Sequence, residues 1–486
     1  MTPKPDLAAI LQDIVNENPG YNLLRNSYFR VPKNNPEFLK KYKSLKFSKS
    51  RGIDIVVIFL AIPKIVLNLI TNLFGSIFMA KQYKYFKIKN QTRGALFVSH
   101  GTNNNLTGVT DVYFSDLPSI IGKQKCTILY LNHNKGSYKT NFKKLSQKSN
   151  CANSLLMPKF LRPTEFTQYL EHCLELLKIQ RKISQNYRYK ESFKAMILIH
   201  AIKWIFSRES YTSYLVNQRI TEINSQIGID MAFFTLEGHG YEEIAANSIK
   251  FKNDKVKLFF YQHSPITKAQ KGVEHFLRNL KYPVTLLTTG PAYSKFLLPF
   301  SLQTKAFCIG SNKIIELNSN QVTKINTLLV APEGTTFASN QFMRYLIRIS
   351  RNYQNYKFIL RLHPNLRFNI STVLLKMRVN KMRNVHISNQ TLVQDLQHSQ
   401  ATLYRSSTVA LETLKAGNIP IFVDFTGEND LNVYSVIKNN FPILSGDDPS
   451  LQLIESLDFE NFNFAVVDEL YISFNPPEDL IYVINN

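Results

Sequence analysis

Short apolar runs alternate with amphipathic stretches along most of the chain after residue 94. Each run ends in polar residues or glycine, as the strands of a buried parallel sheet do. The long amphipathic stretch at residues 164–226 predicts helices. The pattern therefore predicts a doubly wound α/β domain over residues 95–312, with strands in ALFVSHG (95–101), CTILYLN (126–132), IDMAFFTLEG, VKLFFYQH, VTLLTTG and TKAFCIG.

A second alternation of the same kind follows a polar segment at residues 311–326, which we interpret as a linker. Its strand candidates are TLLVAPEG, KFILRLHPN, NVHIS, ATLYRSS and IPIFVDF, with helical stretches between them. We therefore expect a second Rossmann-like domain over residues 313–464 and a C-terminal tail, residues 465–486, that packs back on the first domain. Two such domains predict a two-lobed fold whose substrates meet in a cleft between the lobes.

The first 94 residues combine the most apolar segment of the chain with its most basic region. Residues 25–93 contain 15 Lys and Arg against two acids, and they enclose the apolar segment at residues 53–80. Pro63 and Lys64 divide that segment into runs of 10 and 16 residues, whereas a membrane-spanning helix needs ~20. Basic clusters also flank both ends, so a single crossing would leave one cluster on the wrong side of the membrane.

The second of these apolar runs has a weakly polar stripe along one helical face, formed by Asn68, Thr71, Asn72, Gly75 and Ser76. A basic zone around an apolar segment is typical of proteins that bind the surface of an anionic membrane. We therefore expect residues 1–94 to form a membrane-proximal region with a monotopic or re-entrant helical hairpin. The alternative is a helix pair buried against the catalytic core.

Charge and cysteine content narrow the class of protein further. The net charge of +24 requires a polyanionic partner, but the chain lacks the recognition helix or interleaved basic and aromatic residues of nucleic-acid binders. Its four cysteines lie far apart without a CxxC pair, which favours a reducing compartment and argues against a disulfide framework or a zinc site. The N-terminus mixes acids and prolines into its apolar stretch, unlike a secretory signal peptide. We expect a cytoplasmic protein, peripheral on the inner membrane, that binds no nucleic acid.

Two strand ends of the first domain carry candidate catalytic groups. The segment FFTLEGHGYEE places Glu237 and Gly238 where a strand gives way to a helix, and FFYQHSPI places Gln262 and His263 at the next strand end. Glu237 is a candidate general base for a sugar hydroxyl, particularly if partial burial raises its pKa. Gly238 allows a substrate to approach closely. Gln262 is a candidate for orienting a substrate, and His263 is the competing base.

The second domain carries candidate phosphate-binding groups at two strand ends. Arg361 and His363 end the strand KFILRLHPN and can bind a diphosphate, although a His-Pro pair is equally compatible with a plain loop turn. The next strand-to-helix junction is a candidate anion site or an ordinary helix cap, made of Arg405, Ser406, Ser407 and Thr408. Glu412, one helical turn later, is either an acceptor for ribose hydroxyls or a solvated carboxylate.

Motifs of other enzyme classes are absent from the sequence. No DxD pair ends a strand and no His/Asp cluster has metal-ligand spacing, so we expect no metal in the reaction. The chain has neither a GxxxxGK[ST] loop nor a GxGxxG after a strand, which disfavours ATPase and dehydrogenase functions. We therefore expect no cofactor.

The order of the motifs resembles one known group of enzymes. TLEGHGYE, YQHSPI, LRLHPN and YRSSTVALETLKAGNIPIF, in this order within residues 95–425, resemble bacterial surface-carbohydrate (capsule and lipopolysaccharide) glycosyltransferases of the GT-B fold. They are similar, more distantly, to bacterial sialyltransferases and Kdo transferases, and CDP-glycerol glycerophosphotransferases have a comparable second lobe. The resemblance implies that Glu237 is the base, that His363 contacts the nucleotide and that Ser406 and Ser407 hold its phosphate. Leu236 stands where the sialyltransferase motif often has a second acid, which argues against a sialic acid donor.

This resemblance and the candidate residues together predict an inverting, metal-independent GT-B-type transferase. The expected donor is a CMP- or UDP-linked nucleotide sugar, and the expected acceptor is a surface polysaccharide or a lipid-linked glycan. One alternative is a CDP-alcohol phosphotransferase of the teichoic-acid type, which moves glycerol or ribitol phosphate. Another is a non-catalytic, membrane-docked scaffold that keeps the two-lobed fold.

Overall fold

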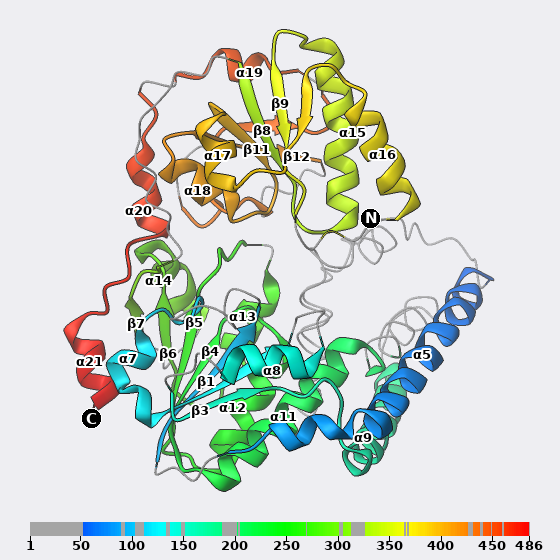
Figure 1. The fold of residues 1–486 in the computed structure, drawn as a ribbon, viewed down its shortest axis with the longest axis vertical. Coiled ribbons are helices and arrows are strands. Elements are labelled where there is room, and N and C mark those ends of the chain that lie inside the picture. The colour runs from blue at the N-terminus through cyan, green and yellow to red at the C-terminus, as the bar shows by residue number, and fades with distance from the viewer. Residues whose placement is uncertain are drawn as a thin grey trace.

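The computed structural model describes residues 52–88, 93–102, 111–132, 137–146, 151–186, 202, 205–268, 270–300, 305–312, 326–363, 366, 369–425, 431–437, 441–448, 450–458 and 461–485. They form two lobes, one above the other in Figure 1, each built on its own sheet. The predicted fold class, α/β with two Rossmann-like domains in a GT-B-like pair, is confirmed. The predicted linker and the first 51 residues lie largely outside the described residues.

A seven-stranded parallel sheet forms the first lobe, in the order β3-β2-β1-β4-β5-β6-β7. Its strands are β1 (Gly94–Gly101), β2 (Cys126–Asn132), β3 (Asn153–Leu156), β4 (Ile229–Thr235), β5 (Lys257–Gln262), β6 (Thr285–Thr288) and β7 (Lys305–Cys308). The helical segments between them are α7 (Leu117–Ile121), η2 (Lys123–Lys125), α8 (Tyr138–Ser146), α9 (Pro163–Asn186), α11 (Arg208–Gln226), α12 (Gly240–Lys252), α13 (Lys271–Arg278), α14 (Pro291–Leu297) and η3 (Leu298–Phe300).

The central strands of this sheet are mainly apolar because both of its faces are buried. Neighbouring residues of a strand point to opposite faces, so Phe97 and Phe233 stack in one core cluster while Leu96 and Phe234 belong to the other. The strand order reverses between β1 and β4. In open α/β sheets ligands bind at such a switch point, beyond the carboxyl ends of the strands.

The second lobe repeats this plan with six parallel strands in the order β10-β9-β8-β11-β12-β13, so its switch point lies between β8 and β11. The strands are β8 (Thr327–Ala331), β9 (Lys357–Leu360), β10 (Val385–Ile387), β11 (Ala401–Tyr404), β12 (Ile419–Asp424) and β13 (Ile443–Ser445). The helices are α15 (Thr336–Asn352), α16 (Ile370–Asn380), α17 (Leu392–Gln397), α18 (Val409–Lys415) and α19 (Gln452–Glu455).

The chain then returns to the first lobe through η5 (Phe464–Val466), α20 (Val467–Leu470) and α21 (Glu478–Asn485), drawn in red in Figure 1. Leu480 and Ile484 of α21 are buried in the core cluster that contains Phe97 of the first sheet. The C-terminal segment is therefore part of the first lobe, and the chain crosses between the lobes twice.

Residues 52–78 form one continuous helix, α5 (Gly52–Phe78), with Pro63 inside it. The predicted hairpin is therefore wrong. A proline removes one backbone donor and crowds one carbonyl, at a cost of about 3 kcal/mol, but the remaining hydrogen bonds continue the helix on either side. Among the described residues, no helix has the length and apolarity needed to cross a membrane.

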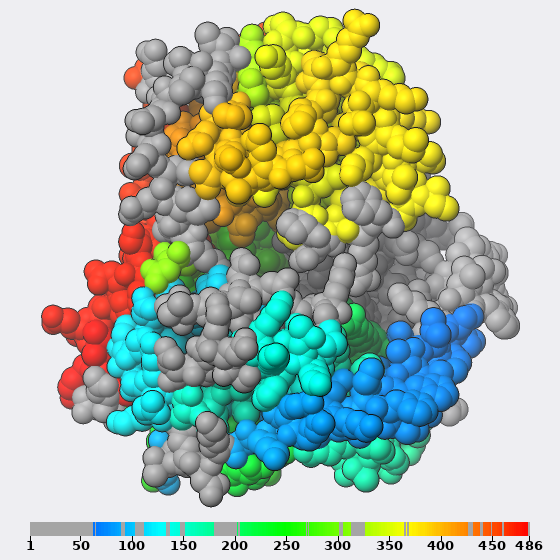
Figure 2. All heavy atoms as spheres, in the orientation of Figure 1, coloured from blue at the N-terminus to red at the C-terminus, as the bar shows by residue number. Residues whose placement is uncertain are grey.

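Helix α5 packs on the first lobe through its small residues rather than through its apolar ones. Gly75 and Ser76 of the predicted polar stripe are buried, and a side chain at Gly75 would collide with the ring of Phe160. The large apolar residues point outward instead: Leu67 is 63% exposed and Phe78 is 69% exposed. The helix runs along the outer edge of the lower lobe, and its atoms form part of the surface in Figure 2.

The short helix η1 (Ala80–Tyr85) fastens α5 to the first lobe. The side-chain oxygen of Gln82 accepts a hydrogen bond from the backbone of Lys159 at 2.9 Å, and the hydroxyl of Tyr83 donates to the carbonyl of Phe160 at 2.8 Å. These contacts join the end of α5 to the segment that precedes α9.

The packing of η1 on the first lobe can be tested at a buried ion pair, that of Arg219, whose guanidinium lies against the ring of Tyr83. Arg219 is almost fully buried and bonds both Glu165 and Glu222, the latter at 2.6 Å. Replacing one partner of a buried pair costs about 3–5 kcal/mol because the other charge stays buried, so Arg219→Met should lower the free energy of unfolding by that amount in denaturant titrations. The exposed pair of Arg278 with Glu274 is the control, since Arg278→Met should cost less than about 1 kcal/mol. Equal losses in the two variants would contradict the assignment.

Candidate active site

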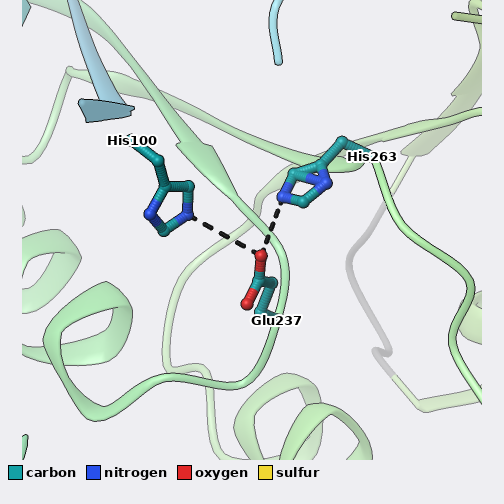
Figure 3. Close-up of side chains that lie close together, drawn as sticks. All are labelled: His100, Glu237 and His263. Carbon is teal, nitrogen blue, oxygen red and sulfur yellow. Dashed lines mark ion pairs between the residues drawn. The ribbon is translucent and has the colours of Figure 1, made fainter. Parts of the chain in front are cut away.

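Three neighbouring strands of the first sheet bring polar side chains together at its switch point. His100 is the last residue but one of β1, Glu237 follows β4 by two residues, and His263 directly follows β5. Because β1, β4 and β5 are adjacent and parallel, their carboxyl ends meet at one edge of the sheet. Figure 3 shows both imidazole rings directed at the Glu237 carboxylate.

The Glu237 carboxylate is surrounded by three histidines. Its Oε1 lies 2.9 Å from Nε2 of His263 and 3.7 Å from Nε2 of His100. Its Oε2 lies 2.7 Å from Nε2 of His239, at the start of α12. The side chains of Glu237 and His239 are 24% and 22% exposed, whereas that of His263 is only 4% exposed. Glu237 and His239 are therefore the members of this cluster that a substrate reaches most easily.

The electrostatics of Glu237 differ from the sequence-based expectation. Burial by itself would raise the pKa of the Glu237 carboxyl, but the hydrogen bond from His239 and the charges of His239, His100 and His263 outweigh it. The pKa of Glu237 therefore falls well below its usual range. The net shift is therefore opposite to the rise that burial alone would produce, and the group is an ionised carboxylate that accepts protons poorly by itself.

A second carboxylate holds the loop that carries Glu237. Glu242 is fully buried, and its side chain accepts hydrogen bonds from the backbone N–H groups of Glu237, Gly238 and His239 at 2.9–3.3 Å. Gly238 has a φ of +71°, in the left-handed region that favours glycine. The loop thus turns sharply around Glu242 and directs Glu237 and His239 outward.

Tyr113 packs against two of the histidines. Its ring centroid lies 4.9 Å from that of His100 and 4.7 Å from that of His263. Burial, together with the charges of Glu237 and Asp111, raises the pKa of Tyr113 to about 12, so the phenol stays neutral. Tyr113 therefore restricts the orientation of both imidazole rings without adding charge.

Sequence reasoning selected Glu237 and His263, and the fold brings these two together. It missed His100, which lies 137 residues before Glu237 in the sequence, and it gave no role to His239, which follows Glu237 by two residues. The available signal for His100 was its place at the end of the first strand, before a polar loop. Nitrogen or oxygen atoms of His100, Glu237 and His263 all lie within 4.8 Å of one another, close enough to hold one metal ion.

A second polar cluster lies at the switch point of the other sheet. Arg405 directly follows β11, and its Nη1 lies 3.5 Å from Oε1 of Glu333, which follows β8. Thr335 also donates to this oxygen, at 3.1 Å. Within the described residues, the buried Oε2 of Glu333 and Oγ of Ser406 have no hydrogen-bond partner. His363 packs against Gly334, where an added Cβ would lie 2.8 Å from its Nδ1.

Glu333 was not selected from the sequence, although a signal for it was present. The pair Glu333-Gly334 follows its strand just as Glu237-Gly238 follows β4. A buried polar atom without a partner costs about 1–3 kcal/mol. Oε2 of Glu333 and Oγ of Ser406 are two of several such atoms among the described residues, and both lie at this edge of the second sheet.

The other site residues predicted from the sequence have contacts within their own lobe. Nη1 of Arg361 bonds Asp395 at 2.8 Å and the carbonyl of Gln390 at 2.7 Å, which ties this guanidinium into the lobe itself. The hydroxyl of Ser407 accepts from the backbone of Val409 at 3.3 Å.

Thr408 is exposed at the start of α18 and makes no side-chain cap. Gln262 is buried, and its amide bonds Thr289 and the carbonyl of Ser264. These contacts stabilise the first lobe.

Tyr471 lies beside the first cluster and within electrostatic range of the second lobe. Its hydroxyl donates to the carbonyl of His263 at 2.6 Å. Burial, together with the negative charge of Glu412 on α18, raises the pKa of Tyr471. Glu412 of the second lobe therefore lies near the strand end that carries His263.

Comparison with known proteins yields only weak structural resemblances. No protein-family model matches the chain, and no curated protein matches it by sequence. Among solved structures, it resembles a UDP-GlcNAc 2-epimerase from Methanocaldococcus jannaschii, with 10% identity, 81% of this chain and 99% of that chain covered, and a TM-score of 0.42. MurG from Acinetobacter baumannii shows 10% identity, the same coverage and a TM-score of 0.43.

Phytolacca americana UGT2, complexed with UDP-2fluoro-glucose and pterostilbene, shows 11% identity, 78% and 94% coverage and a TM-score of 0.42. At such values the likenesses carry no argument about chemistry.

The loop geometry can be tested at Gly238. A Cβ at this position would lie 2.9 Å from the backbone of Gly272 and Val273, in addition to the positive φ. Gly122 also has a positive φ, of +98°, but open space around it, so Gly122→Ala measures the backbone strain alone, about 1–2 kcal/mol. Gly238→Ala should cost about 1–3 kcal/mol more in denaturant titrations because of the collision. Equal losses would show that the loop moves aside freely.

Proposed function

We propose that this protein is an inverting transferase that moves a sugar from a CMP- or UDP-linked donor to a surface polysaccharide or a lipid-linked glycan. The observation that carries this proposal is the Glu237 carboxylate among three imidazoles at the switch point of the first sheet. Inversion needs one group that removes a proton from the acceptor hydroxyl. An imidazole supported by an ionised carboxylate is suited to this task near neutral pH.

Within this proposal, His239 accepts the proton and Glu237 stabilises the imidazolium that forms. The low pKa of Glu237 argues against the carboxylate as the final acceptor, and the exposure of His239 favours it over the buried His263. His263 and His100 then keep Glu237 ionised and in place. This revises the sequence-based choice of Glu237 as the base and of His263 as its competitor.

The second lobe supplies the groups that stabilise the leaving nucleotide. As the acceptor oxygen bonds the sugar, the nucleotide leaves with a negative phosphate, which positive charge and hydrogen-bond donors stabilise. Arg405, His363 and the free hydroxyl of Ser406 are the groups we assign to this phosphate, with no metal bound to it. The bond from Tyr471 to the carbonyl of His263 and the proximity of Glu412 support the two clusters acting on one pair of substrates.

Variants of the two clusters should have different kinetic effects. A general base contributes ~10²–10⁴-fold to rate, so Glu237→Gln and His239→Asn should each lower kcat by about that factor with donor affinity nearly unchanged. His363→Ala should instead weaken binding of the free nucleotide by about 1–3 kcal/mol, the scale of a charge-assisted contact. The measurement is label transfer from CMP-, UDP- and CDP-linked donors to a membrane extract, with nucleotide binding followed by calorimetry.

Each alternative predicts a separate outcome of this assay. Transfer from a CDP-alcohol but not from a nucleotide sugar would establish the polyol phosphotransferase. Neither transfer nor hydrolysis with any donor would favour the non-catalytic scaffold. Normal turnover in both Glu237→Gln and His239→Asn would remove the cluster from the mechanism.

We further propose that α5 attaches the protein to an anionic membrane on its cytoplasmic face. Its outward side is apolar and its inward side is small and polar, the reverse of a helix that covers a protein core. Lys81, Lys84 and Lys87 follow the helix directly, and cations beside an apolar helix face suit the lipid headgroup region. A membrane-bound position brings the site close to lipid-linked acceptors.

Vesicle sedimentation tests this attachment. Leu67 and Phe74 lie on the outward face of α5, and each buried apolar side chain contributes about 1.5–3 kcal/mol. The double variant Leu67→Gln with Phe74→Gln should therefore bind vesicles containing phosphatidylglycerol at least about tenfold more weakly, and added salt should weaken binding of the wild type without abolishing it. Phe251 is 92% exposed and belongs to α12 rather than to α5, so Phe251→Gln is the control. Unchanged binding by the double variant would contradict the proposal.

A further inference from the structure

Two histidines and one glutamate converge at the switch point of the first sheet with their donor atoms within 4.8 Å of one another. We propose that His100, Glu237 and His263 bind one divalent transition-metal ion such as Zn²⁺. This replaces the sequence-based expectation that no metal takes part, which rested on the lack of ligands at local spacing. The three ligands come from the ends of β1, β4 and β5, so only the folded sheet assembles them (Figure 3).

The distances suit a tetrahedral ion. Bonds of about 2.0–2.1 Å at tetrahedral angles place ligand atoms roughly 3.3 Å apart. The two separations from Oε1 of Glu237, 2.9 Å to His263 and 3.7 Å to His100, lie on either side of this value. The two imidazole rings are nearly perpendicular, at 85° with centroids 6.1 Å apart, so they approach the carboxylate from different directions. Small side-chain movements would complete the geometry.

The surroundings have the features that orient metal ligands in proteins. A ligating carboxylate is usually hydrogen-bonded through its other oxygen, and Oε2 of Glu237 lies 2.7 Å from Nε2 of His239. Tyr113 packs on both ligand imidazoles. Glu242 holds the backbone that carries Glu237. The ligands are therefore preorganised by contacts that the rest of the site supplies.

Two imidazoles with one carboxylate are a ligand set of catalytic zinc sites, in which the fourth position takes water or substrate. Glu237 is partly exposed, so this position is within reach of a small ligand. On the basis of the proposed function, the fourth position would take the acceptor hydroxyl. A bound ion would lower the pKa of that hydroxyl, and His239 would accept its proton.

Metal binding itself is the test, measured on the full chain. After treatment with a chelator, Co²⁺ should bind with one equivalent per chain and produce the visible absorption of a tetrahedral site, and Zn²⁺ should displace it. His100→Gln and Glu237→Gln should lose this absorption, while His239→Asn should bind about 10–100-fold more weakly because it removes an outer contact. His275 is a buried histidine of α13 that bonds Asn279, and His275→Gln should bind Co²⁺ like the wild type.

Folding is monitored by circular dichroism in every variant. Two ligand variants are measured so that the test still holds if one of them fails to fold. Folded His100→Gln and Glu237→Gln proteins that bind Co²⁺ like the wild type would overturn the proposal, as would the absence of stoichiometric binding by the wild type. Transfer activity is a separate measurement. Metal binding without any transfer would reject the proposed transferase function and support the metal site. Transfer without stoichiometric metal binding would reject the metal site and support the transferase function.

Discussion

The geometry of the first site depends on the carboxylate of Glu242. It accepts the N–H groups of Glu237, Gly238 and His239, which would otherwise lack partners at the start of α12. A neutral amide at this position would keep the shape but would lose part of the strength of three charge-assisted bonds. Hydrogen bonds to the first turn of α12 therefore hold the loop that carries Glu237 and His239.

The two sheets repeat one constraint, because each reverses its strand order at a switch point and carries a Glu-Gly pair beyond one of its strands. In the first lobe the glutamate is surrounded by imidazoles, whereas in the second it faces Arg405 and hydroxyl groups. The same backbone plan thus places one carboxylate among imidazoles and the other beside a guanidinium. Tyr471 bonds the carbonyl of His263 in the first lobe and interacts electrostatically with Glu412 of the second.

The sequence predicted most of this arrangement because buried parallel strands are apolar along their whole length and end in polar residues. Glu237 and His263 were recognisable for that reason. The edge strands β3 and β13, of four and three residues, were not predicted. His100 was missed because its proximity to Glu237 follows from strand order, and the low pKa of Glu237 follows from three charges that no local motif combines. The helix through Pro63 escaped prediction because a proline weakens a helix without always ending it.

The double passage of the chain between the lobes has a mechanical consequence. A single linker would let one lobe swing in any direction, but the returning segment is attached to both lobes. Lys415 of α18 bonds Asp468 of α20 at 2.9 Å, and Thr289 of the first lobe donates to the carbonyl of Leu470. Two passages of the chain define an axis, so the lobes can rotate about the line that joins them and resist motion across it.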